Sequence, residues 1–344
     1  MKILFFGELV PNIVHGISLA NRLNIDLLSD VFEIKIVEEK SDFKEYGKRN
    51  SSKIKKMCFY AKEIFSINRK NNYGYFYTVF SLSTFGSFKT LFVILAYVLS
   101  GQGQVVLHVH RGDFELFYHK NILNKIITKI IFMLINKLII LSDNQKIEFT
   151  NYIKEDNIYV LENSLSEEHD FEVKKKSNKN FLYISNYIKE KGIFELLEVF
   201  QDLPSLNLEC FGGFIYNEKE IRKYESVNIK INRFINGKEK YQKIHEAIAL
   251  ILPSWNEGQP TIILEAMMIG TIVLTTKVGL IGELLGEDYP FYFEPRDVTS
   301  FRECIEKFVS YDGKSELSMK LKKVYFEKYS KRMHQKKLKK IFGI

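Results

Sequence analysis

Two glutamates eight positions apart carry the chemistry that this sequence suggests first. Glu257 stands in a glycine-containing stretch, and Glu265 follows in a helix-forming stretch that ends at Gly270. A buried strand is expected to end at Pro253, so Glu257 should lie in a loop and Glu265 about one and a half turns inside the next helix. Both carboxylates can then face one extended ligand, and each can accept two hydrogen bonds from a vicinal diol.

The loop between these glutamates offers backbone donors to the same ligand. Gly258 allows the main chain to approach a ligand closely, and Pro260 suits the first turn of a helix, where its missing N–H costs nothing. The amides of Gly258, Gln259 and Thr261, with the positive end of the helix, favour hydroxyls or an anion. This setting is far more specific than a pair of glutamates at the same spacing.

The elements that position this loop are expected to alternate between strands and helices, which predicts a parallel, doubly wound α/β fold. The first series of expected strands covers 3–6, 32–37, 75–80, 105–109, 138–141 and 159–161, and the second covers 181–185, 206–211, 227–231, 249–252 and 272–275. The charged stretch 166–179 between the two series is predicted to be a linker. A length of 344 residues suits two such domains, and ligands bind beyond the carboxyl ends of their strands.

The motif around the two glutamates resembles that of glycosyltransferase family 4, whose members are retaining enzymes of the GT-B type. The matching residues run from Ser254 through the Glu257-Gly258-Gln259-Pro260 and Leu264-Glu265-Ala266 stretches to Gly270. The resemblance continues at Asn163, in the strand–loop–helix stretch 183–192 and in the glycine-containing loop 278–283. The N-terminal portion, with Gly16 and the stretch 108–112, resembles members that build bacterial surface polysaccharides such as capsule, O-antigen or exopolysaccharide.

This resemblance implies two Rossmann-like domains that face each other across a cleft. Residues 1–165 would bind the acceptor and residues 180–324 the nucleotide-sugar, with 166–179 as the linker. A terminal helix from Val324 to Phe342 would cross back, so that 325–344 packs on the first domain. The implied activity is transfer of a hexosyl group from a nucleotide-sugar, by default a UDP-sugar, to a saccharide or lipid-linked saccharide.

The resemblance also implies roles for single residues. Glu257, His110 and Lys191 are the implied catalytic residues: Glu257 contacts hydroxyls of the donor sugar, His110 lies near that sugar, and Lys191 neutralises the diphosphate as the nucleotide leaves. Glu265 grips the ribose hydroxyls. The other implied donor-binding residues are Gly16, Ser185, Asn186, Asn236, Gly237, Gly258, Gln259, Pro260 and Thr261.

One position departs from the family pattern. The family usually has an arginine five residues before the lysine that neutralises the diphosphate, whereas this chain has Asn186 before Lys191. An asparagine can hydrogen-bond a phosphate but brings no charge. Either Lys189 supplies the missing charge, or catalysis is slower and the site is degenerate.

No metal or other cofactor is expected. The sequence contains no D-x-D motif, which many other glycosyltransferases use to hold a cation on the diphosphate. His108 and His110 alternate along one expected strand and so share a face, but no third metal ligand is evident in the sequence. His108 is interpreted as structural.

The net charge of +8 is unevenly distributed and suggests an anionic partner. Residues 41–70 contain nine Lys/Arg against three Asp/Glu, interleaved with aromatic and aliphatic residues. Such a helix could lie on an anionic membrane, or its lysines could form an ordinary solvated face. The three cysteines are far apart, and no uninterrupted apolar run could span a bilayer. A reduced, cytoplasmic protein, peripheral on the inner face of the membrane, is expected.

Two alternatives to transfer remain open at this point. The chain could act on a nucleotide-sugar without transferring it, as an epimerase does. It could also be a catalytically weak nucleotide-sugar-binding subunit of a polysaccharide assembly complex, as Asn186 would suggest. A role in nucleic-acid binding rests on the high isoelectric point alone, and the sequence has no motif for it.

Overall fold

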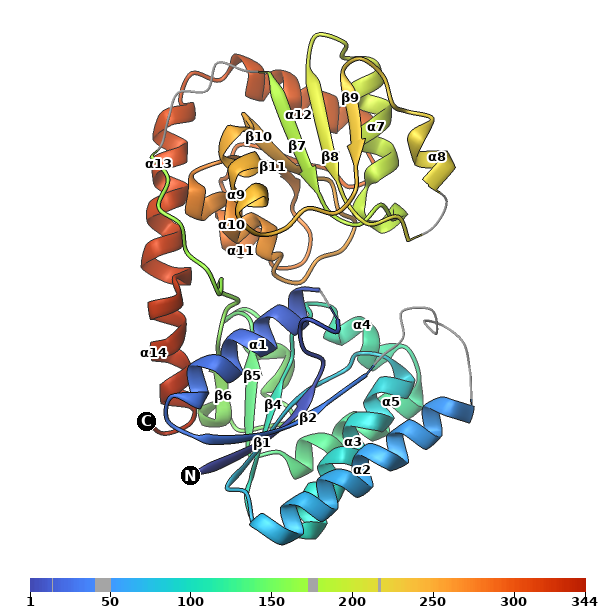
Figure 1. The fold of residues 1–344 in the computed structure, drawn as a ribbon, viewed down its shortest axis with the longest axis vertical. Helices are drawn as coiled ribbons and strands as arrows, with labels where there is room; N and C mark the ends of the chain where they lie inside the picture. The colour runs from blue at the N-terminus through green and yellow to red at the C-terminus, as the bar shows by residue number, and fades with distance from the viewer. Residues whose placement is uncertain (14, 41–50, 173–178, 216–217) are drawn as a thin grey trace. The chain divides into compact units, whose positions relative to one another are not determined.

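The computed structural model describes residues 1–13, 15–40, 51–172, 179–215 and 218–344 (Figure 1). The chain divides into two compact units, one formed by Met1–Ser166 with Arg332–Ile344 and the other by Glu167–Lys331. Each unit is built on a six-stranded sheet in which every pair of neighbouring strands is parallel. The predicted α/β class is therefore confirmed in both units.

The first unit contains a sheet with the strand order β2-β1-β3-β4-β5-β6. Its strands are β1 (Lys2–Gly7), β2 (Glu33–Glu38), β3 (Tyr75–Val79), β4 (Gln104–His108), β5 (Lys137–Ile140) and β6 (Ile158–Val160). Its helices are α1 (Gly16–Ser29), α2 (Ser51–Asn71), α3 (Thr84–Ser100), α4 (Phe114–His119), α5 (Ile122–Leu134), α6 (Lys146–Phe149) and α14 (Lys331–Ile341). The predicted strands of the first series agree with these bounds to within one residue.

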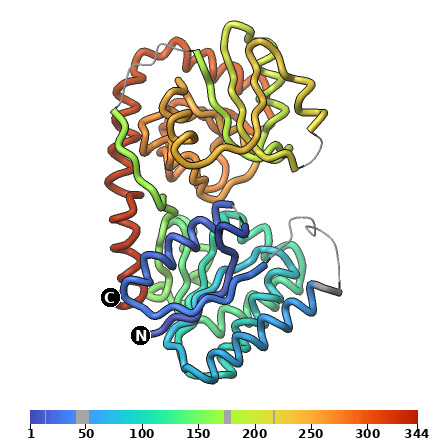
Figure 2. The backbone as a smooth tube through the Cα atoms, in the orientation of Figure 1, coloured from blue at the N-terminus to red at the C-terminus, as the bar shows by residue number. Residues whose placement is uncertain are grey.

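The two faces of this sheet are covered by different helices because successive side chains of a strand point to opposite sides. Leu4 and Phe6 of β1 pack in the core formed with α2, α3 and α5. Ile3 and Phe5 pack on the other face with α1 and with the end of α14 around Phe342. Figure 2 shows α14, at the red end of the tube, beside the early strands of this unit.

The second unit repeats the architecture with the strand order β12-β11-β10-β7-β8-β9. Its strands are β7 (Asn180–Ile184), β8 (Asn207–Phe211), β9 (Ile229–Asn232), β10 (Ala249–Leu252), β11 (Ile272–Thr276) and β12 (Tyr292–Phe293). Its helices are α7 (Ile193–Gln201), α8 (Glu218–Arg222), α9 (Gly237–Glu246), α10 (Thr261–Ile269), α11 (Ile281–Leu285), α12 (Val298–Ser310) and α13 (Lys314–Val324). Five of these strands were predicted to within two residues, whereas β12 is too short to give a periodic signal.

Aromatic side chains join the second sheet to one of its helix layers. Phe181 of β7 contacts Phe200 of α7 and Phe308 of α12, with ring centroids 5.4 and 5.7 Å apart. A separate layer contains α9, α10 and α13, with α10 in contact with both others. The helix α10 is buried almost all round, because seven of its nine residues are buried. This burial fixes the helix that carries Glu265.

The predicted terminal helix differs from the observed one. A π-helical turn over Tyr325–Tyr329 follows α13, and Ser330, with a ψ of 152°, interrupts the helix before α14 begins. Only Arg332–Ile344 belongs to the first unit, because Tyr325 and Tyr329 donate hydrogen bonds to Glu168 and to the carbonyl of Glu283 in the second. The segment placed on the first unit therefore starts seven residues later than predicted.

Part of the expected linker 166–179 packs on the second unit. Lys322 of α13 hydrogen-bonds the Asp170 carboxylate at 2.7 Å, and the His169 ring packs on Tyr241 with centroids 4.4 Å apart. Residues 167–172 thus pack on the second unit, and 173–178 lie outside the described residues. Among the described helices, none is both long enough and apolar enough to cross a membrane.

Candidate active site

The loop after β10 is held by two neighbouring loops at the carboxyl edge of the second sheet. Gly192 follows β7 with a φ of +67°, and a Cβ there would lie 2.0 Å from the carbonyl oxygen of Pro253. Gly279 follows β11 with a φ of +57°, and its Cβ would lie 1.8 Å from the carbonyl oxygen of Glu257. Only glycine allows backbones to approach this closely in the left-handed conformation. The three loops therefore pack as one assembly around Glu257.

Glu257 is the centre of a charged cluster in this assembly. Its Oε1 atom accepts hydrogen bonds from Lys191 Nζ at 2.6 Å and from Ser254 Oγ at 2.7 Å. The Glu257 side chain is 9% exposed and that of Lys191 27% exposed, so the ion pair is largely shielded from water. The structure thus brings together two of the three residues that were predicted to be catalytic, and it adds Ser254.

The backbone between the glutamates is arranged much as predicted. Pro260 occupies the N-cap position of α10, one residue earlier than expected, and no side chain caps the helix there. Thr261 is the first helical residue, Gln259 is buried, and the Gly258 carbonyl accepts from the amide of Leu280 at 3.1 Å. An uncapped helix start presents backbone N–H groups that a ligand can satisfy.

Glu265 forms a second buried ion pair, which the sequence did not predict. Its Oε1 atom accepts from Lys240 Nζ of α9 at 2.7 Å. Its Oε2 atom is buried and has no hydrogen-bond partner among the described residues. Burial raises the pKa of Glu265, Lys240 lowers it and the charge of Glu167 raises it again. A buried acceptor without a partner is costly, and a ligand donor could satisfy it.

The predicted base-binding loop lies directly before Lys240. Asn236 is the N-cap residue of α9, and Gly237 follows with a φ of +57° and open space where a Cβ would be. Lys240 is three residues farther along the same helix. The helix that begins at the predicted loop thus also carries the partner of Glu265.

The loop after β7 places Asn186 and Lys189 in different surroundings. The Ser185 amide donates to the carbonyl of Phe211, and a Cβ on Gly213 would lie 2.9 Å from Asn186 Oδ1. Asn186 therefore packs beside the loop that follows β8. The Lys189 ammonium lies 5.6 Å from the centroid of the Trp255 ring.

Trp255 also carries a second cation. The Arg296 guanidinium lies 4.1 Å from the same ring centroid, a cation–π contact. Arg296 has a φ of +65°, which is uncommon for a residue other than glycine. The indole Nε1 donates to Glu195 Oε1 at 3.1 Å. Lys189 thus lies over Trp255 rather than beside Asn186 in the described structure.

In the first unit, the predicted residues fall at the start of α1 and at the end of β4. His15 caps α1: its Nδ1 accepts from the Ser18 amide at 3.2 Å, and its Nε2 lies 2.7 Å from Glu8 Oε2. Gly16 is the first residue of α1, and a Cβ there would meet no atom within 4 Å. A ligand could approach the Gly16 backbone without steric hindrance.

His110 is buried and stacks on His108, with ring centroids 3.7 Å apart. Within the described part of the chain, neither ring nitrogen of His110 makes a hydrogen bond of full geometry, although the Asn163 side chain is close enough to affect the ring. Burial, reinforced by the nearby His15 and His334, lowers the pKa of His110 to about 3, while Asn163 acts in the opposite direction. The imidazole is therefore neutral near pH 7 and can accept or donate a hydrogen bond.

His108 belongs to a buried hydrogen-bond chain, which agrees with its structural interpretation. Its Nδ1 lies 2.8 Å from the Tyr77 hydroxyl, which also accepts from Asn24 Nδ2 at 2.8 Å. Asn24 Oδ1 lies 2.6 Å from Nε2 of His334 in α14. In the described residues no group of three His, Cys, Asp or Glu side chains could hold a metal ion.

Comparisons with known proteins place these sites in a family context. Residues 166–324 match the model of the family described as Glycosyl transferases group 1. TuaC of Bacillus subtilis (strain 168), which is assigned to teichuronic acid biosynthesis as a glycosyltransferase, is 25% identical over 131 residues. These residues are 37% of this chain and 32% of that protein, so the match spans about a third of the curated relative.

Two solved structures share the fold over nearly their whole length. Sucrose-phosphate synthase from Thermosynechococcus elongatus has a TM-score of 0.79 at 11% identity, with 99% of this chain and 98% of that chain covered. HepE of Anabaena in complex with UDP-glucose has a TM-score of 0.71 at 13% identity, with 99% of both chains covered. The chain therefore has the GT-B fold, and its residues 166–324 match the family model of the group 1 glycosyl transferases.

Proposed function

We propose that this protein is a retaining glycosyltransferase that moves a sugar from a nucleotide-sugar, with UDP-sugars as the first candidates, to a saccharide acceptor. The main observation is that two carboxylates at the edge of the second sheet, the half-buried Glu257 and the buried Glu265, are each paired with one lysine. Lys191 can bind a diphosphate and Glu257 can bind sugar hydroxyls. The Oε2 atom of Glu265, which has no partner among the described residues, can accept a hydrogen bond from a further hydroxyl. The family match of this unit and the UDP-glucose complex of HepE support the donor class.

In the proposed reaction, one bond to the anomeric carbon breaks and another forms. The bond to the donor phosphate oxygen breaks while the acceptor hydroxyl oxygen bonds to the same face of the sugar, and the acceptor proton moves to the departing phosphate. Lys191 and the uncapped start of α10 stabilise the negative charge that develops on the diphosphate. These groups and the absence of a D-x-D motif favour a metal-independent reaction.

The remaining assignments rest on the resemblance to family 4. Glu257 would contact hydroxyls of the donor sugar, and His110 would lie near the transferred sugar. The backbone of Gly16 would meet the diphosphate. A neutral, buried His110 beside Asn163 is compatible with hydrogen bonding to a sugar hydroxyl.

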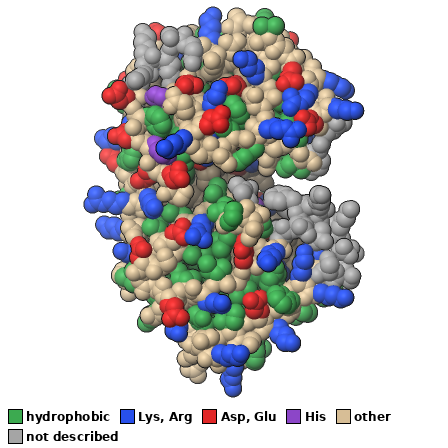
Figure 3. Space-filling model, in the orientation of Figure 1, with side chains coloured by type: hydrophobic (Ala, Val, Ile, Leu, Met, Phe, Trp, Pro, Cys, Tyr) green, Lys and Arg blue, Asp and Glu red, His purple; other side chains and the backbone are tan. Residues whose placement is uncertain are grey.

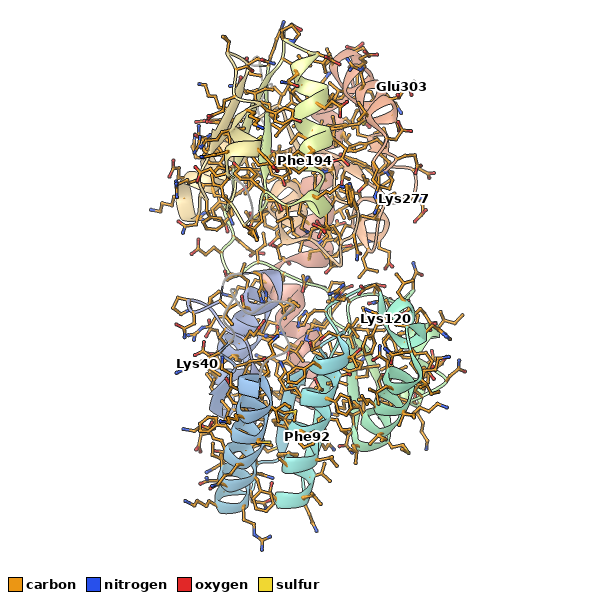
Figure 4. The ribbon with its side chains drawn as sticks, turned by 90° about the vertical axis from the view of Figure 1, so that its right-hand side faces the viewer. Lys40, Phe92, Lys120, Phe194, Lys277 and Glu303 are labelled. Atoms are coloured by element: carbon orange, nitrogen blue, oxygen red, sulfur yellow. The ribbon has the colours of Figure 1, made fainter. Side chains whose placement is uncertain are left out.

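A lipid-linked acceptor at an anionic membrane is proposed from the outer surface of the first unit. The helices α2, α3 and α5 lie side by side there (Figure 4) and together contain nine Lys/Arg and one acidic residue, Glu63. Their exposed apolar side chains are Ile54, Phe59, Phe65, Phe85, Phe92, Val98, Leu99, Ile122, Leu123, Ile126 and Met133. Exposed apolar side chains among cations are typical of surfaces that bind anionic lipid.

This surface is only partly the one that the sequence suggested. Residues 41–50 of the predicted basic stretch lie outside the described residues. In α2, Met57, Tyr60 and Ile64 pack into the core, whereas Ile54 and Phe59 remain exposed. Figure 3 shows that hydrophobic side chains also gather on the face of the first unit seen in that view, with Lys and Arg around them.

The experiment that tests the proposed function is a screen of UDP-, GDP- and ADP-sugars for nucleotide release in EDTA, with and without membrane lipid extract. We expect release from one donor, and a higher rate when lipid is present. Release of free sugar without a glycosylated acceptor would instead favour an epimerase-like or hydrolytic reaction. Binding of one nucleotide without any release would favour the binding-subunit alternative.

The surroundings of the diphosphate site support the binding-subunit alternative. Asn186 brings no charge to the site, and Lys189 contacts Trp255. The ammonium of Lys191 is already engaged by Glu257, so a donor diphosphate must compete for it or share it. If this competition prevents catalysis, Asn186→Arg should raise turnover, whereas in an active transferase it should change turnover little.

A further inference from the structure

We propose that Lys240 sets the sugar selectivity of the nucleotide site by holding Glu265 ionised and leaving its second oxygen to the ribose 2′-hydroxyl. This inference rests on the proposed function, because it assumes that Glu265 faces the ribose of a bound nucleotide. Lys240 would act through Glu265, so it is a positioning residue.

The two carboxylate oxygens of Glu265 have different surroundings: one is bound by the protein and the other is left for a ligand. Lys240 Nζ donates to Oε1 of Glu265 at 2.7 Å, and the two side chains are 18% and 6% exposed. The packing of α9 against α10 holds both side chains in place. Oε2 is buried and has no partner among the described residues. The lysine therefore fixes one oxygen and leaves the other as the acceptor.

Lys240 opposes the other influences on Glu265 by favouring its ionised form. Burial raises the pKa of Glu265, as does the charge of Glu167, whereas Lys240 lowers this pKa by its charge and by its hydrogen bond. Tyr241 of α9 is close enough for the Glu265 charge to raise its pKa, and the His169 ring packs against Tyr241. Lys240 is the group in this described set that favours the charged carboxylate. Without it, the remaining influences favour the neutral acid.

The protonation state of Glu265 decides what this site recognises. An ionised carboxylate oxygen accepts hydrogen bonds from hydroxyls, and such charge-assisted bonds are stronger than neutral ones. A 2′-deoxynucleotide would leave this buried acceptor with one donor fewer, and sites built around a hydroxyl reject analogues that lack it. A neutral Glu265 would lose both the affinity for ribose and much of this discrimination.

Calorimetric titration of the full-length protein with UDP and 2′-deoxy-UDP tests the inference. If the wild type prefers GDP or ADP, the ribo and 2′-deoxy forms of that nucleotide are used instead. We expect the wild type to prefer the ribonucleotide by about tenfold or more, and Lys240→Met to lose most of that preference. Lys240→Arg should retain it. The matched control is Lys243→Met, on the same helix, which removes a pair with Glu209 and should leave the preference unchanged.

The outcomes separate this inference from the proposed function. An unchanged preference in Lys240→Met, or an equal loss in Lys243→Met, overturns the role of Lys240 while nucleotide binding by the wild type stands. A wild type that binds none of the three nucleoside diphosphates refutes the proposed function and this inference with it. If Lys240→Met does not fold, Lys240→Gln removes the charge but keeps a donor, and the same loss of preference is expected.

Discussion

At the scale of single residues, each glutamate of the site is paired with its own lysine. Glu257 is paired with Lys191 and Glu265 with Lys240, and all four side chains are mostly shielded from water. A shielded pair whose partner is removed leaves an uncompensated charge. Substitutions at the two glutamates should therefore have large effects, and the effects should differ in kind.

Glu265→Ala should weaken binding of the nucleoside diphosphate by about tenfold or more, because it removes the proposed acceptor for ribose hydroxyls. Glu257→Ala should not weaken that affinity, because Lys191 is then free for the diphosphate, and should lower turnover by about 100-fold, because the proposed contact of Glu257 is with the transferred sugar. Calorimetry and steady-state kinetics on both variants measure the two effects. Equal nucleotide affinity in Glu265→Ala and wild type would contradict the assignment.

Two parts of the site show what the sequence could and could not predict at this scale. Lys191 and Glu257 were both predicted because each lies in a stretch after a strand that resembles a family motif. The pairing of Lys240 with Glu265 was missed, because the two residues are 25 positions apart and meet only when α9 packs on α10. A lysine three residues after Gly237 gives no local signal of its partner.

At the scale of elements, the site depends on loops whose glycines permit close backbone contact. Gly279 and Gly237 have the same φ of +57°, but only at Gly279 would a Cβ collide with a neighbouring backbone. At Gly192 a Cβ would likewise collide with a neighbouring backbone, at the carbonyl of Pro253. The position of Glu257 thus follows from the packing of three loops.

Gly279→Ala should destabilise the second unit by at least about 3 kcal/mol and reduce turnover, because the loop of Glu257 must move. Gly237→Ala is the matched control: it imposes the same left-handed backbone on alanine without a collision, and should cost about 1–2 kcal/mol. Urea unfolding of both variants measures the difference. Equal free energies of unfolding would show that the close approach of the two loops is not maintained in solution.

The outer helices of the first unit lead to a prediction about membranes. Replacing Phe59 and Ile126 together by serine should reduce binding to vesicles that contain anionic lipid by about tenfold, because both side chains are exposed on the apolar, cationic surface. Val227→Ser is a suitable control, since Val227 is 99% exposed in the second unit. Co-sedimentation with anionic and with neutral vesicles gives the comparison. Binding that is unaffected by the double substitution would exclude this surface.

The position of a helix end was predicted wrongly where tertiary contacts outweigh the local sequence pattern. The strands were predicted because short apolar runs mark them in the sequence, whereas the terminal helix was predicted as continuous although Ser330 interrupts it. Side-chain bonds from Tyr325 and Tyr329 hold the preceding turn on the second unit. Such bonds have no periodic signature.

At the scale of the whole molecule, buried histidines should make stability depend on pH. Burial lowers the pKa of His334 to about 4 and that of His110 to about 3, and it also lowers the pKa of His108. An unfolded histidine titrates near 6.5. As pH falls from about 6.5 toward 4, the unfolded chain therefore takes up protons that the folded chain refuses, and stability falls.

Each of these histidines should cost about 1.4 kcal/mol of stability per pH unit in that window. Urea unfolding at pH 7.5 and pH 5 measures the loss. His334→Gln should reduce this pH dependence by about a third, whereas His119→Gln, which alters an exposed side chain of α4, should leave it unchanged. A stability that does not change between these pH values would show that the histidines are accessible to protons in the folded protein.

The central claim, that this molecule transfers a sugar, is tested most directly by mass spectrometry of the acceptor. The protein is incubated in EDTA with the donor that the screen identifies and with membrane lipid extract. We predict a lipid-linked product heavier by one sugar residue, formed in a one-to-one ratio with released nucleoside diphosphate and with the anomeric configuration of the donor retained. Nucleotide binding with neither a glycosylated product nor released nucleotide would contradict this activity.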